Sequence, residues 1–229
     1  MAILVDMNSS DPLSPFQQLG DVAALIDDTT AAIAVAHRRP AALRRADIIV
    51  GESVLRGAKL SGMLDGAAVE DMVSPYAVLS PETAAMTAQT FLRAPSQVFA
   101  RLDVAAGGEG KPSDPQRMEA LARLITAPGV SGLLLAQVVH FEVAGRELFG
   151  SRSGVVGRVS SRCAALATGV DPLGICVPET YYNRHREDYA VALTGWVSGD
   201  RHAVTQALEF GLRAWIAGAE EADGIARAA

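Results

Sequence analysis

The stretch Val138–Gly169, VVHFEVAGRELFGSRSGVVGRVSSRCAALATG, decides how the rest of the chain is interpreted. An apolar run at helical spacing comes first, followed by a polar loop at residues 150–154 and a second helical run. We expect Ser153 to cap the second helix, because its hydroxyl can accept a hydrogen bond from an N–H two or three residues later. Gly169 is the residue type that favours the left-handed backbone after a helix. The stretch therefore predicts two helices joined by a short loop.

The loop between these two helices has the composition of an anion site. Its residues, Gly150-Ser151-Arg152-Ser153-Gly154, are small or polar. The first N–H groups of the following helix are unpaired and carry the positive end of the helix dipole. Arg158 follows one turn later, so Arg152, Ser153, Gly154 and Arg158 are the candidate anion-binding residues. A well-capped helical hairpin without a ligand is the alternative interpretation, and the residues alone leave both open.

The composition describes a folded, acidic protein. The chain has 229 residues, of which 49% are hydrophobic and 5% aromatic, with mean hydropathy +0.20. Its formal net charge is −6 and it has no basic tail, which argues against a nucleic-acid partner because that partner requires a clustered basic face. No apolar run reaches the roughly 18 residues of a membrane span, and the N-terminus lacks a positively charged signal region. We therefore expect no membrane partner and a cytoplasmic location.

The cysteines and histidines predict no metal site. Cys163 and Cys176 match neither the spacing of metal ligands nor that of a disulfide framework. His140 lies in an apolar helical run and is interpreted as a hydrogen-bonded core histidine rather than a base. The remaining histidines are scattered without metal-ligand spacing: His37, His185 and His202.

Nearly every segment has the helical period and none alternates as a strand does, so the sequence predicts an all-α fold. Residues 1–15 are interpreted as a flexible N-terminal arm and residues 16–229 as a single helical domain. The Gly- and Pro-rich residues 105–115 are expected to form a long loop. Predicted helices include 16–37, 41–64, 179–197 and one from residue 200 to 218 or beyond, with a frayed tail at 220–229.

The twelve-residue stretch ELFGSRSGVVGR, residues 147–158, resembles the signature of the Fic (Fido) family. That signature, His-Pro-Phe-x-(Asp/Glu)-Gly-Asn-Gly-Arg-x-x-Arg, lies between two helices, and the family is best known for transferring AMP from ATP onto a protein hydroxyl. Phe149, Gly154 and Arg158 match it. The resemblance extends over about residues 20–216 and implies a Fic-like helical domain with the motif loop between two central helices. It also includes His140 and the downstream pattern Arg186-x-x-Tyr189-x-x-x-Leu193.

Most positions that carry chemistry in the family are substituted here. Glu147 occupies the position of the catalytic His, Ser151 that of the metal-binding acid and Ser153 that of the Asn. Val155 replaces the first phosphate-binding Arg. Valine cannot contact phosphate and serine is a poor Mg²⁺ ligand, so the substitutions argue against standard AMP transfer. ATP and Mg²⁺ are expected cofactors only if the family activity persists.

An upstream motif resembles the inhibitory helix of bacterial family members. Ser61-x-x-x-Asp65-Gly66 is similar to the family's (Ser/Thr)-x-x-x-Glu-(Gly/Asn), whose Glu bonds the last Arg of the signature. Residues 16–66 are accordingly expected to form an inhibitory-type helical segment, with Gly66 ending its last helix. The corresponding positions, Asp65 and Arg158, keep opposite charges, and we predict that they form a partly buried ion pair.

The expected function is that of a pseudoenzyme: a degenerate Fic-like protein that binds a protein partner or an anionic small molecule. A second interpretation is a non-standard nucleotidyl transferase, with Glu147 as base and Arg152 supplying charge to the phosphate. A third is a helical interaction scaffold, since a fold does not by itself imply a function. A homo-oligomer is compatible with the sequence, which does not fix the oligomeric state.

Overall fold

The computed structural model describes residues 11–229, and these residues form helices and loops without a strand, so the all-α prediction is confirmed. No helix in this part of the chain combines the length and apolar character needed to cross a bilayer. The α-helices are α1 Val22–His37, α2 Pro40–Arg44, α3 Ala46–Asp65, α4 Val69–Tyr76, α5 Ala84–Arg93, α6 Pro95–Ala105, α7 Pro115–Thr126, α8 Gly132–Gly145, α9 Ser153–Ala167, α10 Glu179–Arg184, α11 Arg186–Ser198 and α12 Arg201–Ala228. Short 3₁₀ helices are η1 Ser14–Gln18, η2 Ala77–Leu79 and η3 Gly150–Arg152.

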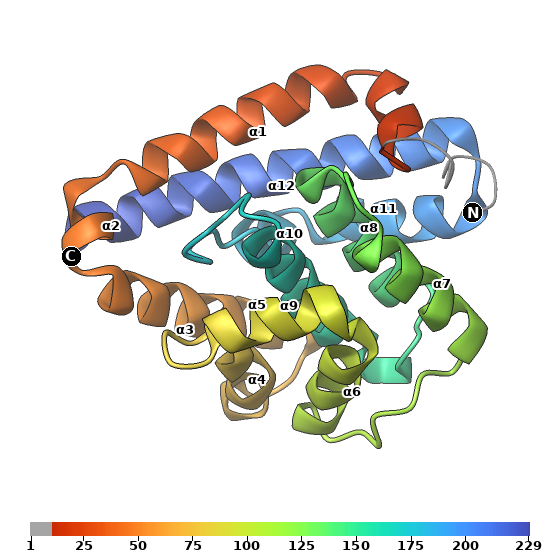
Figure 1. Ribbon diagram of the computed structural model, residues 1–229, viewed down its shortest axis with the longest axis horizontal. Coiled ribbons are helices and arrows are strands. Elements are labelled where there is room, and N and C mark those ends of the chain that lie inside the picture. The colour runs from red at the N-terminus through yellow and green to blue at the C-terminus, as the bar shows by residue number, and fades with distance from the viewer. Residues whose placement is uncertain (1–10) are drawn as a thin grey trace.

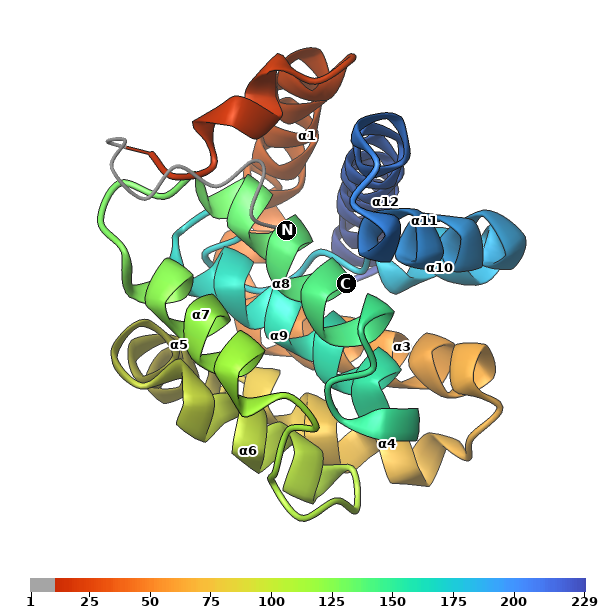
Figure 2. The same ribbon diagram turned by 90° about the vertical axis from the view of Figure 1, so that its right-hand side faces the viewer.

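Helices α8 and α9 form the centre of the molecule (Figure 2). Every residue of α8 from Leu133 to Ala144 is buried, which explains why this helix is apolar on all sides. Gly157 of α9 lets the two helices approach closely, because a Cβ there would lie 3.0 Å from the Cβ of Ala144. The predicted hairpin is present, and it is the core of the fold.

The other helices surround this pair. Helices α3, α4, α5 and α6 pack on α9, and α11 packs on α8. The long helix α12 runs beside α1 along one side of the molecule (Figure 1). The C-terminal end of α3 and the N-terminal end of α9 therefore meet, which places Ser61 and Asp65 beside the motif loop.

Several predicted helices are broken or longer than expected. The stretch 16–37 is divided into η1 and α1 near Gly20, whose φ is +44°, and the stretch 179–197 is divided at His185. The predicted frayed tail is wrong: α12 continues to Ala228, because Ala222 and Ala226 are buried. Tertiary packing stabilises an end that its local sequence marks as weak.

The predicted N-terminal arm is only partly covered by the structure. Residues 1–10 lie outside the described residues. Residues 11–15 are packed rather than loose, with Leu13 fully buried. The Asp11 carboxylate accepts hydrogen bonds from the backbone N–H groups of Leu13 and Ser131, which attaches this segment to the start of α8.

Candidate functional site

Arg158 of α9 is the centre of the candidate site. Its side chain is 1% exposed and its Nη2 lies 2.5 Å from Oδ2 of Asp65, so the predicted ion pair is present. Its Nε donates to the Ser61 hydroxyl at 2.8 Å, and its Nη1 lies 3.5 Å from the Tyr189 hydroxyl. Both polar residues of the inhibitory-type motif thus contact the last residue of the signature. We call the contact of Asp65 and Ser61 with Arg158 the latch.

The latch lies directly over the first turn of α9. A Cβ on Gly154 would lie 3.0 Å from Oδ1 of Asp65 and 3.0 Å from Nη1 of Arg158. A side chain at this position would therefore press on the ion pair, which would have to shift by a few tenths of an ångström. The positive end of the α9 dipole faces a carboxylate that belongs to the chain itself. Gly66, which ends α3 with φ +66° as predicted, positions this carboxylate.

His140 is buried behind the latch between two tyrosines. Its Nε2 lies 2.8 Å from the Tyr189 hydroxyl and its Nδ1 lies 3.1 Å from the Tyr182 hydroxyl. Burial, together with the positive charge of Arg158, lowers the pKa of His140 to about 3, so the ring is neutral. The neutral ring carries one N–H, so one ring nitrogen donates to its tyrosine hydroxyl and the other accepts from its tyrosine hydroxyl. The prediction of a satisfied core histidine is confirmed.

A second buried ion pair, which was not predicted from the sequence, lies one turn further along α9. Arg162 Nη1 lies 3.6 Å from Oε1 of Glu179, which also accepts a 2.7 Å hydrogen bond from the Tyr76 hydroxyl. Arg162 and Glu179 are both buried. Arg158 and Arg162 are four residues apart, so they share one face of the helix. This spacing could have indicated that Arg162 is buried beside the candidate site.

Ser153 differs from its predicted role as a cap, and Glu147 lies in the turn between α8 and the motif loop. Ser153 does not cap α9 with its side chain: it is the first helical residue, and its hydroxyl instead accepts a 2.7 Å bond from the N–H of Phe149. Glu147 is exposed and has a left-handed backbone, with φ +52°. Its backbone carbonyl accepts from the Ser113 hydroxyl at 3.3 Å, and its side chain forms no hydrogen bond or ion pair with the residues of the latch.

Arg152 joins the motif loop to the Gly-rich loop at residues 106–114. Its Nε donates to Oδ1 of Asp103 at 2.6 Å, and Asp103 is fully buried. The other oxygen of Asp103 accepts from the N–H of Gly110 at 2.8 Å, which fixes the Gly-rich loop. Among the residues that the structure describes, the two terminal nitrogens of Arg152 form no hydrogen bond.

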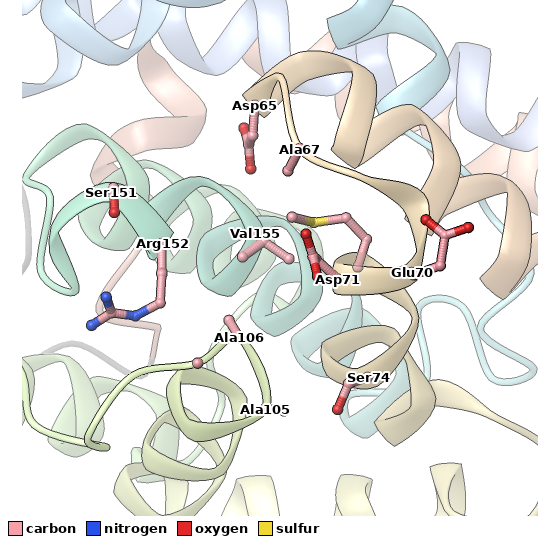
Figure 3. Close-up of a pocket in the computed structure, with 12 residues that line it drawn as sticks. Asp65, Ala67, Glu70, Asp71, Ser74, Ala105, Ala106, Ser151, Arg152 and Val155 are labelled. Carbon is pink, nitrogen blue, oxygen red and sulfur yellow. The ribbon is translucent and has the colours of Figure 1, made fainter.

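A cavity of about 520 Å³ opens beside the latch, between α3, α4, the end of α6 and the start of α9 (Figure 3). We call it the motif cavity. Three acidic residues line it, Asp65, Glu70 and Asp71, and one basic residue, Arg152. Glu70 and Asp71 form no ion pair within residues 11–229, whereas Asp65 is paired with Arg158. Its lining consists of Asp65, Ala67, Glu70, Asp71, Met72, Ser74, Ala105, Ala106, Gly107, Ser151, Arg152 and Val155.

The described residues contain no group of three His, Cys, Asp or Glu side chains that could hold a metal ion. Cys163 and Cys176 are both free and buried, and burial raises the pKa of Cys163 to about 12, so it is an unreactive thiol. No protein-family model matches the chain, and a search of the curated proteins finds no significant relative. The function is therefore inferred from the residues of the latch and of the motif cavity.

Proposed function

We propose that this chain is a Fic-like protein with a degenerate motif, which acts as a binding or regulatory protein and not as a standard AMP transferase. The observation that carries the proposal is the position of the Asp65 carboxylate, which contacts Arg158 over the first turn of α9. A phosphate bound there would use the N–H groups and dipole at the start of that helix. The carboxylate places negative charge at that position, where it repels a phosphate.

ATP and Mg²⁺ do not fit the residues around the latch. Val155 is a buried apolar residue of the cavity wall, and Ser151 provides no carboxylate for a metal ion. The unpaired carboxylates of Glu70 and Asp71 would repel a triphosphate in the same cavity. Loss of a general base lowers the reaction rate by about 10²–10⁴-fold, and loss of electrostatic stabilisation lowers it by a similar factor. These costs together argue against phosphoryl or nucleotidyl transfer at this site.

The non-standard transferase is less well supported. It requires Glu147 and Arg152 to act on one bound nucleotide. Arg152 lines the motif cavity, but Glu147 does not. Glu147 is also exposed, so it lacks the buried surroundings that adapt a carboxylate to general-base work at neutral pH. The motif cavity likewise favours a ligand-binding protein over a scaffold without a ligand.

The proposal is tested by incubating the full chain with α-labelled ATP, Mg²⁺ and a panel of protein acceptors. We expect no label transfer above the level without the chain. In a thermal-shift titration we expect ATP to leave the Tm unchanged, because a ligand that binds the folded state would raise it. Label transfer that disappears in Glu147→Gln, but persists in the exposed-acid control Glu187→Gln, would overturn the proposal.

A further inference from the structure

We propose that the motif cavity binds a zwitterionic small molecule, whose anionic group lies at Arg152 and whose cationic group lies at Glu70 and Asp71. An aliphatic segment of the ligand would join the two groups across the apolar floor of the cavity. This inference deepens the proposed function, because it rests on the chain being a binding protein and adds the chemical class of the ligand.

The anionic end is defined by Arg152. Asp103 holds this side chain through Nε at 2.6 Å, so the planar guanidinium is fixed before a ligand arrives. The terminal nitrogens form no hydrogen bond with the described residues, and the side chain is 33% exposed. A guanidinium presents paired donors that match a carboxylate in bidentate geometry. Arg152 can therefore bind one carboxylate without giving up its contact with Asp103.

The cationic end is defined by Glu70 and Asp71 in the first turn of α4. Both side chains lie across the cavity from Arg152, beyond Val155 (Figure 3). Their negative charge also stabilises the N-terminal end of α4, which accounts for their presence on a helix start. This helix-end stabilisation does not explain why the two side chains also line a cavity. The other charged residues of that cavity, Asp65 and Arg152, each form an ion pair. The carboxylates of Glu70 and Asp71 are exposed and unpaired within residues 11–229, so an ammonium group of a ligand could pair with them.

The region between the two charged ends is apolar. Met72 and Val155 are buried residues of this wall, and Ala67, Ala105 and Ala106 complete it. Methylene groups of a ligand would be removed from water here, which contributes favourable free energy to binding. The volume of about 520 Å³ lies within the range of about 300–1,000 Å³ that is typical of small-molecule sites.

The test is calorimetric titration of the full chain with 4-aminobutanoate, 6-aminohexanoate and 8-aminooctanoate, which vary the distance between the two charges. Hexylamine and hexanoate are matched probes that each carry only one charge. We expect at least one zwitterion to bind about three- to ten-fold more tightly than both single-charge probes, because only it forms both ion pairs. Equal binding by hexylamine, or no measurable binding by any of the zwitterions, overturns the proposal.

A charge-neutral double variant tests the cationic end in the same assay. Glu70→Gln with Asp71→Asn is expected to weaken zwitterion binding about three- to ten-fold and not to weaken hexanoate binding, because the two carboxylates repel an anion. The matched control, Glu187→Gln with Asp188→Asn, removes two acids from the first turn of α11 and is expected to leave binding unchanged. The same effect in both double variants, or in neither, contradicts the proposal. A negative titration refutes only the ligand class, whereas AMP transfer refutes the proposed function.

Discussion

Replacing Asp65 with asparagine isolates the charge of the latch. Asparagine keeps the size of the side chain and one hydrogen-bond acceptor, so packing against Gly154 is unchanged. Arg158 would then retain only neutral partners, the hydroxyls of Ser61 and Tyr189. Burial alone would lower the pKa of Arg158, but the negative charge of Asp65 raises it, so the guanidinium stays charged. The variant therefore leaves a buried cation without a counter-charge.

The magnitude follows from the burial of the two partners. Breaking a fully buried ion pair costs about 3–5 kcal/mol, whereas an exposed pair contributes only about 0.2–1 kcal/mol. The Arg158 side chain is 1% exposed, but that of Asp65 is 22% exposed, so water screens part of the interaction. We expect Asp65→Asn to lower the free energy of unfolding by about 1–3 kcal/mol, between these two limits.

Urea unfolding followed by far-UV circular dichroism measures this loss, with wild type and variant compared at a common m value. The control is Asp28→Asn, an exposed acid within α1, for which we expect a change within about 0.5 kcal/mol. If Asp65→Asn is as stable as this control, the ion pair contributes nothing to the folded state and the reasoning on the latch is refuted.

Three further changes give independent readouts. Because burial and Arg158 lower the pKa of His140 to about 3, below the value of about 6.5 in the unfolded chain, protons bind the unfolded state better as the pH falls. Lowering the pH from 7 to 5 should then reduce the free energy of unfolding by about 2 kcal/mol through this residue. Urea titrations should show this loss in the wild type and not in His140→Gln. Gly154→Ala should lower the Tm because its methyl group displaces the latch, whereas Gly224→Ala, in open space, should not; equal Tm values would contradict this. Arg152→Gln should speed proteolysis within residues 106–114, because it unpairs buried Asp103; an unchanged cleavage rate would contradict the coupling of the two loops.

The helical fold and the latch could be predicted because their signals are local or carried by a motif. Hydrophobic spacing identified the central hairpin, and the left-handed backbones of Gly66 and Gly169 end helices as their residue type predicts. The ion pair between Asp65 and Arg158 was predicted from two charges that persist where the other motif residues are substituted. These features depend on a few residues each, so they can be recognised without the rest of the structure.

The remaining features depend on contacts between distant parts of the chain. Arg152 pairs with Asp103, which lies 49 residues earlier and in a helix with no motif of its own. Ser153 has the residue type of a helix cap, but its hydroxyl accepts a hydrogen bond from the backbone N–H of Phe149 instead. The last turns of α12 contain Gly and acidic residues, yet burial of Ala222 and Ala226 keeps them helical. The motif cavity also arises where five separate elements meet, namely α3, α4, α6, η3 and α9, so no single stretch of sequence encodes it.

The central claim is that the latch covers a motif without transferase chemistry, and the Asp65→Asn variant tests it most directly. This variant removes the carboxylate charge from the start of α9. If the site were able to transfer AMP, the variant would therefore be more active than the wild type. With α-labelled ATP, Mg²⁺ and protein acceptors, we predict that wild type and variant both transfer no label. Transfer by Asp65→Asn that is lost on adding Glu147→Gln would show instead that the latch restrains a working enzyme.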